Sequence, residues 1–480
     1  MTVLGRILLS SNYALMAFAL GIVIRVIPIV LSWPYSVGFD TTALYIPLML
    51  RGPPSLNAIL TYPGLNSLLI WSGYQLFRQP FFVLDFFGAI LQGALALSSY
   101  VYARSVVISE KKFAFLTSAL FTLSPLTLRL TWDQYRISEC LVATMIALVA
   151  IRSKSPGVRF MTIPLTILVI VTNPLPSVFL LLTLMAQTLF DYRRNRPFVI
   201  GLLASTIGGV GFVAQQWVLA TSGLLSSNVQ VSVLGPLGGA SLALYGVTFL
   251  IFTSWPLLLF LPWIFRIREA SPHMLWLLMV MFFAVVLLTI GIYTIPPAFV
   301  YLMSSFPLAM FSGAAIKRFG TNRVFRVLIG VALVFLTTNA ATYLISSPLS
   351  PNGYMALGQP FRYYIPTGYL QSTVPVSYQK DLLELLTISM SSLPRDSNLY
   401  LPRQFYGLAL TVPNLRSLTL VDLGEANPWI ASPFDSIASG NSSFTIWFVN
   451  GSNWYGISSL PLNFEALQTQ GQFALYQIVS

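Results

Sequence analysis

The chain has few of the residues on which many enzymes rely. Its 480 residues include one cysteine, Cys140, and one histidine, His273. An intramolecular disulfide is therefore excluded, and a cysteine–histidine zinc site or a serine–histidine–aspartate triad lacks its side chains. We expect His273 to lie in a solvated cytoplasmic loop beside Arg266 and Arg268. Any catalysis must use carboxylates, arginines and tyrosines, with or without a metal held by oxygen ligands.

Charged residues are also scarce. They make up 8% of the chain, and hydrophobic residues make up 56%, whereas a typical soluble domain has about 25% charged residues. The charges fall in short clusters between long apolar runs, as the bilayer requires. The net charge of +12 comes from basic residues spread over several loops, so we predict no nucleic-acid partner. The composition predicts a multi-pass membrane protein.

The apolar segments predict a polytopic α-helical protein of the plasma membrane with about 11 spans, several of them short for a bilayer that requires about 20 residues. With the N-terminus inside, most of the basic residues fall in cytoplasmic loops, as the positive-inside rule requires. The basic residues left on the outer side of the membrane region are Arg25, Arg51, Arg78, Arg129 and Arg136. The segments are 11–32, 81–103, 113–130, 138–152, 159–173, 175–190, 197–221, 240–265, 273–293, 298–316 and 324–346.

Two ambiguous stretches are settled by the same rule. The apolar run Tyr62–Phe77 would invert every later loop if it crossed the membrane, so we expect a surface or re-entrant helix within an outer loop of about 33–80. A break at Asn173-Pro174 divides residues 159–190 into two spans. A second outer loop is expected at about 131–137.

After about residue 347 the sequence changes in character. Proline, serine and asparagine become frequent, and short apolar runs such as Ser417–Val421 and Phe444–Val449 alternate with polar stretches. We therefore predict a transmembrane domain over 1–346 and a soluble α/β domain over 347–480, extracellular or periplasmic. The sequons at Asn441 and Asn450 are compatible with that side of the membrane.

The acidic residues of the membrane region are unevenly distributed. Those in cytoplasmic loops stand beside basic residues and are typical solvated charges: Glu110, Asp191 and Glu269. The others lie on the outer side or at the outer ends of helices: Asp40, Asp85, Asp133 and Glu139. Ionisable groups near the membrane are costly and tend to mark functional sites. The sequence therefore places any site on the outer face.

Asp40 directly precedes Thr41–Leu50, which is expected to form a short amphipathic helix. One interpretation is a helix N-cap, a position that aspartate favours. The other is a carboxylate at the membrane surface that takes a proton from an acceptor hydroxyl.

The second outer loop carries a dense polar cluster over Arg129–Glu139. Arginines suit phosphate oxygens, aromatic rings suit sugar faces, and Asp133 could hold a metal or a sugar hydroxyl. The alternative is an interfacial aromatic belt with a local Arg–Asp pair. Arg25 and Asp85 are expected to pair with each other or with another polar group. In the tail, Arg362 lies among aromatic residues just after the last span.

At these residues the chain resembles the C-type integral-membrane glycosyltransferases, which include protein O-mannosyltransferases, aminoarabinose transferases and oligosaccharyltransferases. The shared pattern is an acidic residue in a long first outer loop, a surface helix, and a second acidic residue in the next outer loop. These features are Asp40 in Gly38-Phe39-Asp40, the stretch Tyr62-Pro63-Gly64-Leu65, and Asp133-Gln134-Tyr135-Arg136. Thr41 stands where some members have a second acidic residue. The tail lacks a Trp-Trp-Asp-type motif, which favours transfer of one sugar over a whole oligosaccharide.

The resemblance implies a glycosyltransferase that takes a hexose or pentose from a polyprenyl-phosphate carrier in the outer leaflet. The acceptor would be a protein, lipid or glycan, and direct displacement would invert the anomeric centre. It implies Asp40 as general base, Asp133 as a second acid and Arg136 as a phosphate contact. Further candidates for substrate binding are Arg129, Tyr135 and Arg362. The sequence leaves open whether a divalent metal, Mg²⁺ or Mn²⁺, lies between Asp40 and Asp133.

Two other functions stay open. A transporter or flippase for lipid-linked sugars needs polar residues through the mid-membrane, and the spans after Glu139 contain few beyond Gln187, Gln215 and Gln216. A noncatalytic membrane scaffold would instead use the tail to bind a partner.

Overall fold

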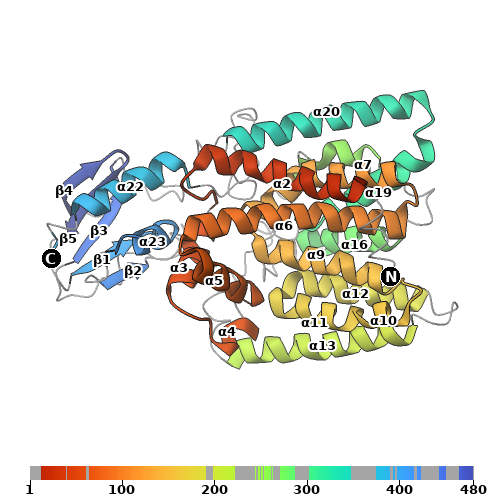
Figure 1. The fold of residues 1–480 in the computed structure, drawn as a ribbon, viewed down its shortest axis with the longest axis horizontal. Helices are drawn as coiled ribbons and strands as arrows, with labels where there is room; N and C mark the ends of the chain where they lie inside the picture. The colour runs from red at the N-terminus through yellow and green to blue at the C-terminus, as the bar shows by residue number, and fades with distance from the viewer. Residues whose placement is uncertain are drawn as a thin grey trace.

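The computed structural model consists of a bundle of roughly parallel helices with a small α/β unit at one end (Figure 1). The structure describes residues 12–38, 40–60, 64–190, 198–221, 244, 247–248, 250–251, 253–260, 262, 271–286, 302–346, 374–389, 393–394, 397–413, 415, 419–422, 443–449 and 464–478. Almost half of the predicted span 240–265, the sequons at Asn441 and Asn450, and Arg362 lie outside these residues.

Three described helices are long and apolar enough to cross a membrane. They are α2 (Asn12–Ser32), α6 (Pro80–Tyr102, continued by η2, Ala103–Val107) and α20 (Arg323–Ser346). Helices α2 and α20 end, and α6 begins, at the end of the bundle that carries the α/β unit (Figure 1). The first loop, which connects α2 to α6, therefore lies at that end. The predicted number of spans stays a prediction, because the remaining helices are shorter or bent.

The remaining helices of the bundle follow the predicted apolar segments. They are α7 (Lys111–Leu123), α8 (Pro125–Asp133), α9 (Tyr135–Ala150), α10 (Pro156–Phe160), α11 (Thr162–Thr172), α12 (Pro174–Phe190), α13 (Phe198–Thr221), α16 (Ser271–Met281) with η6 (Phe282–Val286), and α19 (Ser305–Phe319). The predicted break at Asn173 is confirmed, since Asn173 has extended backbone angles and Pro174 begins α12. Cys140 is fully buried in α9, where its thiol donates to the Val169 carbonyl (3.5 Å).

Two segments differ from expectation. The predicted span 113–130 is divided into α7 and α8, which bend by 63° at Ser124. The residue before a proline is pushed out of the α region, and Pro125 then begins the next helix. Within the predicted loop 131–137, only Gln134 departs from helical geometry between α8 and α9. The turn between α8 and α9 therefore consists of Gln134 alone.

The expectation that His273 lies in a solvated loop is wrong. His273 is 2% exposed near the start of α16, and its Nε2 lies 2.9 Å from the Tyr102 hydroxyl. Phe306 and Phe311 pack around the ring. A neutral imidazole with a hydrogen-bond partner can be buried, which sequence position alone does not reveal.

The first loop contains four short elements: η1 (Thr41–Tyr45), α3 (Ile46–Leu50), α4 (Leu56–Leu60) and α5 (Leu65–Phe77). The predicted short helix 41–50 and the helix within 62–77 are both present. Gly64 introduces α5 with φ 83°, and a Cβ there would lie 2.8 Å from the Val171 carbonyl oxygen. This close approach fixes the start of α5 against the end of α11.

The C-terminal unit is a mixed five-stranded sheet with the order β2-β1-β3-β5-β4. Strand β1 pairs in parallel with β2 and β3, and β5 pairs antiparallel with β3 and β4. Its elements are α22 (Val376–Ser389), β1 (Asn398–Leu401), α23 (Arg403–Leu410), β2 (Thr419–Asp422), β3 (Ser443–Phe448), β4 (Phe464–Gln470) and β5 (Phe473–Ile478). The apolar runs Ser417–Val421 and Phe444–Val449 thus correspond to β2 and β3.

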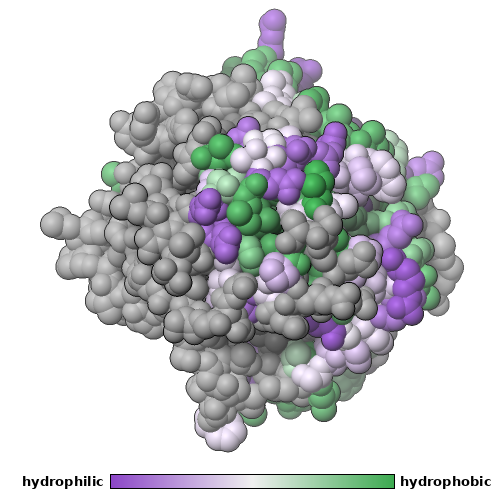
Figure 2. All heavy atoms as spheres, turned by 90° about the vertical axis from the view of Figure 1, so that its left-hand side faces the viewer, coloured by the Kyte–Doolittle hydropathy of each residue, from purple (hydrophilic) through white to green (hydrophobic). Residues whose placement is uncertain are grey.

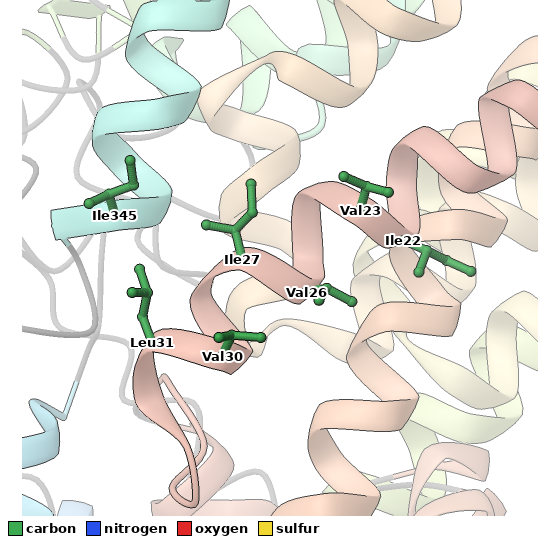
Figure 3. A pocket seen from close by; sticks show the side chains of 7 residues that line it. All are labelled: Ile22, Val23, Val26, Ile27, Val30, Leu31 and Ile345. Atoms are coloured by element: carbon green, nitrogen blue, oxygen red, sulfur yellow. The ribbon is translucent and has the colours of Figure 1, made fainter.

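The surfaces of the two parts differ. Seen from the side of the C-terminal unit, the described residues mix hydrophilic and hydrophobic side chains (Figure 2). Along the bundle, many exposed side chains of α2, α13 and α20 are aliphatic, as expected for surfaces in contact with lipid tails. An apolar groove runs between α2 and α20 and is lined by residues such as Val23, Ile27, Val30 and Ile345 (Figure 3).

Helices α2 and α6 pack at a point of close backbone contact, which gives a test of the bundle. A Cβ on Gly21 would lie 2.5 Å from the Gln92 carbonyl oxygen. We expect Gly21→Ala to force these helices apart and to destabilise the protein by about 1–3 kcal/mol. The matched control is Gly211→Ala in α13, where a Cβ meets no atom within 4 Å. Thermal unfolding in detergent measures both, and equal midpoints would contradict this packing.

Candidate functional site

Asp40 lies at the start of η1, but it does not act as a helix cap. Its side chain makes no capping hydrogen bond. Instead its Oδ2 accepts a hydrogen bond of 2.8 Å from the Gln134 amide nitrogen, which belongs to the turn between α8 and α9. Asp40 is half-buried, whereas Gln134 is 7% exposed. The two loop motifs that the sequence singled out therefore meet through this contact.

Two buried tyrosines stack next to this contact: Tyr45, which interacts with the Asp40 carboxylate, and Tyr135, which follows Gln134 in the chain. Their rings stack with centroids 5.0 Å apart and an interplanar angle of 7°. Both side chains are buried. Burial, followed by the Asp40 carboxylate, raises the pKa of Tyr45 well above its usual value, while the charge of Arg136 acts in the opposite direction. Tyr45 therefore stays protonated and does not act as a base at neutral pH.

Two arginines supply positive charge near Asp40. Arg129 of α8 is buried, and its guanidinium interacts electrostatically with Asp40 and Tyr45. Arg136, on the first turn of α9, is half-buried and close enough to Tyr45 to act on its phenol. An arginine fork of this kind suits an anionic oxygen, such as that of a phosphate. The arrangement combines one accessible carboxylate with flanking guanidinium groups.

A second carboxylate lies nearby on α9. Glu139 Oε1 accepts a hydrogen bond of 2.5 Å from the Asn66 side chain of α5. Asn66 is fully buried, and the Gly64 approach to α11 described above sets its position. The sequence analysis included Glu139 among the acidic residues predicted on the outer side. Nothing in the sequence indicated Asn66, because a single asparagine in an apolar run forms no recognisable motif.

Arg25 and Asp85 form a buried polar layer behind this site. Arg25 donates to the Trp132 carbonyl (3.4 Å) and the Tyr135 hydroxyl (3.5 Å), and its guanidinium lies over the Trp132 ring. Asp85 Oδ1 accepts from the Ser36 hydroxyl (3.1 Å). Among the described residues the two charges therefore use other partners rather than a direct ion pair. This layer connects α2, α6, α9 and the start of the first loop.

The structure brings together most of the predicted site residues. Asp40, Arg129 and Arg136 surround Tyr45, whereas Tyr135 is fully buried beneath it and donates to the Leu84 carbonyl (3.2 Å). Tyr135 thus has a supporting position. Asp133 is the last residue of α8, and its side chain lies outside the described part, as does Arg362. Within the described residues, no three His, Cys, Asp or Glu side chains converge as metal ligands.

The chain has the fold of the C-type integral-membrane glycosyltransferases. It is similar to ArnT from Cupriavidus metallidurans, with 98% of each chain covered and 13% identity. The TM-score is 0.59 for the apo structure of ArnT and 0.54 for its structure bound to undecaprenyl phosphate.

A weaker similarity is to the oligosaccharyltransferase of Archaeoglobus fulgidus, crystallised with Zn and sulfate (TM-score 0.43, 12% identity, 85% of this chain and 62% of the other). By sequence, the chain matches no protein-family model and no curated protein.

The Asn66–Glu139 hydrogen bond can be tested by stability. Asn66→Leu leaves a buried carboxylate without its donor, so we expect a loss of about 1–3 kcal/mol in unfolding free energy. The double variant Asn66→Leu/Glu139→Leu removes both polar partners and should recover part of that loss. Thermal unfolding in detergent measures the cycle, and a double variant less stable than the single one would contradict the pairing.

Proposed function

We propose that this protein transfers a single sugar from a polyprenyl-phosphate carrier to a hydroxyl of a protein, lipid or glycan at the outer face of the membrane. The observation that carries the proposal is the half-buried Asp40 carboxylate, held by Gln134 beside Arg129 and Arg136. The fold shared with ArnT, one structure of which holds undecaprenyl phosphate, supports the class of donor.

In the proposed reaction the acceptor oxygen attacks the anomeric carbon while the bond from that carbon to the phosphate oxygen breaks. The acceptor proton passes to Asp40, which acts as general base. Arg136 and Arg129 stabilise the negative charge that develops on the departing phosphate. Attack opposite the leaving group inverts the anomeric centre. The Gln134 amide donates to one carboxylate oxygen of Asp40 and so orients the carboxylate.

The apolar groove between α2 and α20 offers a path for the isoprenoid chain. It follows the last turns of α2 and includes Ile345 of α20 (Figure 3). Two residues earlier on the same helix, Tyr343 packs edge-on against Trp132 with ring centroids 5.2 Å apart, next to the buried Arg129. The groove lining is entirely aliphatic, which suits hydrocarbon.

The transporter alternative gains no support from the described mid-membrane residues. Gln215 of α13 is buried and donates to the Ile170 carbonyl (2.9 Å), which ties it to helix packing. The scaffold alternative and a role for Mg²⁺ or Mn²⁺ between Asp40 and Asp133 are decided by the experiment that follows.

We expect Asp40→Asn to lower transfer by about 10²–10⁴-fold, because the amide cannot accept the acceptor proton. The matched control is Glu110→Gln, which neutralises an exposed carboxylate at the start of α7 and should leave transfer unchanged. Mass profiles of surface glycans and lipid-linked sugars are compared at equal membrane abundance, and purified protein is assayed with EDTA and with added Mg²⁺ or Mn²⁺. Unchanged profiles in the Asp40→Asn cells would overturn the transferase proposal in favour of the scaffold or transporter.

The groove gives a separate prediction about the carrier chain. Val30→Trp places a large ring in the groove, so we expect the KM for a full-length polyprenyl donor to rise about tenfold, or ~1.4 kcal/mol. A donor with a very short chain should be unaffected. Val210→Trp, on the exposed face of α13, is the control because its valine is similarly exposed, at 66% against 68% for Val30. If Val30→Trp changes the KM for the long and the short donor equally, the isoprenoid chain does not bind in this groove.

A further inference from the structure

The segment that carries Asp40 is held between the membrane helices and the C-terminal unit. On the membrane side, the Ser36 hydroxyl donates to Asp85 Oδ1 (3.1 Å) and to the Phe81 carbonyl (3.3 Å). On the opposite side, Gln379 of α22 donates from its amide nitrogen to the Ser36 carbonyl (2.9 Å). Ser36 is therefore fixed from both sides, four residues before Asp40.

Gln379 is well placed to serve as an anchor. Its side chain is fully buried, and the same amide nitrogen also donates to the Val374 carbonyl (2.9 Å). The bond to Val374 orients the amide from within the C-terminal unit, and the bond to Ser36 connects it to the first loop. A buried, doubly bonded amide has little freedom to move, so the Ser36 carbonyl is held at a set position.

A second contact lies just after Asp40. Gly407 of α23 packs so closely on η1 that a Cβ would overlap the Thr42 carbonyl oxygen and lie 2.9 Å from Cδ of Pro47. The neighbouring residues Phe405 and Leu408 point into the core of the C-terminal unit. Arg51, at the end of α3, lies over the ring of Tyr406 at 5.8 Å from its centroid. The glycine thus lets one rigid helix rest directly on the backbone of the first loop.

We propose that the C-terminal unit is part of the catalytic arrangement, and that Gln379 and Gly407 are positioning residues for Asp40. They hold the loop backbone before and after Asp40, while Gln134 holds its carboxylate from below. The C-terminal unit then acts on the rate of transfer through the placement of the base, and not through binding of the donor. This inference rests on the proposed transferase function.

The experiment uses the full chain in nanodiscs with a polyprenyl-phosphate-linked sugar as donor. A shift of about 1 Å in a reacting group can cost about 100-fold in rate. We therefore expect Gly407→Ala and Gln379→Met each to lower kcat by about 10–100-fold, with the KM for the donor changed less than twofold. Gln379→Met removes the amide donor at nearly constant volume and keeps the test valid if Gly407→Ala fails to fold.

The control is Gln472→Met, an exposed glutamine of the same unit at the turn between β4 and β5. It should keep the wild-type kcat. If the wild-type protein shows no sugar transfer that depends on Asp40, the proposed function itself is wrong. If the wild-type protein transfers sugar and the folded Gly407→Ala and Gln379→Met variants keep the wild-type kcat, only this further inference is overturned. A rise in KM with unchanged kcat would also overturn it, because the C-terminal unit would then act in binding.

Discussion

The site depends on one contact across the sequence, the hydrogen bond from Gln134 to Asp40. It joins a loop before the second long helix to a turn 94 residues later. The contact exists because the chain between α8 and α9 departs from helical geometry at a single residue, which aims the amide of Gln134 toward the first loop. A longer loop here would leave the amide free to move. The stacked rings of Tyr45 and Tyr135 add a second contact between the first loop and α9.

Charge near a membrane needs partners, and the bundle provides them in layers. Behind Asp40, Arg25 is placed against a carbonyl, a phenol and the face of an indole, and Asp85 against a serine hydroxyl. The two groups form no direct ion pair within the described residues, although the charge of Arg25 also acts on the Asp85 carboxylate. Dipoles that are fixed by helix packing need no rearrangement when charge develops nearby. The layer thus gives the site a rigid polar background inside an otherwise apolar bundle.

Sequence patterns predicted the parts of this structure that depend on local chemistry. The short helix after Asp40 and the break at Asn173 follow from proline placement and apolar periodicity, and the distribution of charge singled out Asp40 and the segment Arg129–Glu139. Contacts between distant elements were not accessible in this way. Neither the Gln134 amide, nor the Asn66–Glu139 pair, nor the buried His273 has a characteristic spacing, since each depends on which helix lies opposite. The bend at Ser124 was in principle predictable from Pro125, but the apolar run around it concealed the break.

The contact between Gln379 and Ser36 also bears on how the protein is made. The two residues are 343 positions apart, so their hydrogen bond can form only after most of the chain has left the ribosome. During synthesis the first loop is made early, whereas the C-terminal unit that covers it is translated near the end. A chain released too soon would contain both predicted loop motifs but would lack the cover. The contacts that hold the first loop around Asp40 are therefore complete only when the C-terminal unit has been translated.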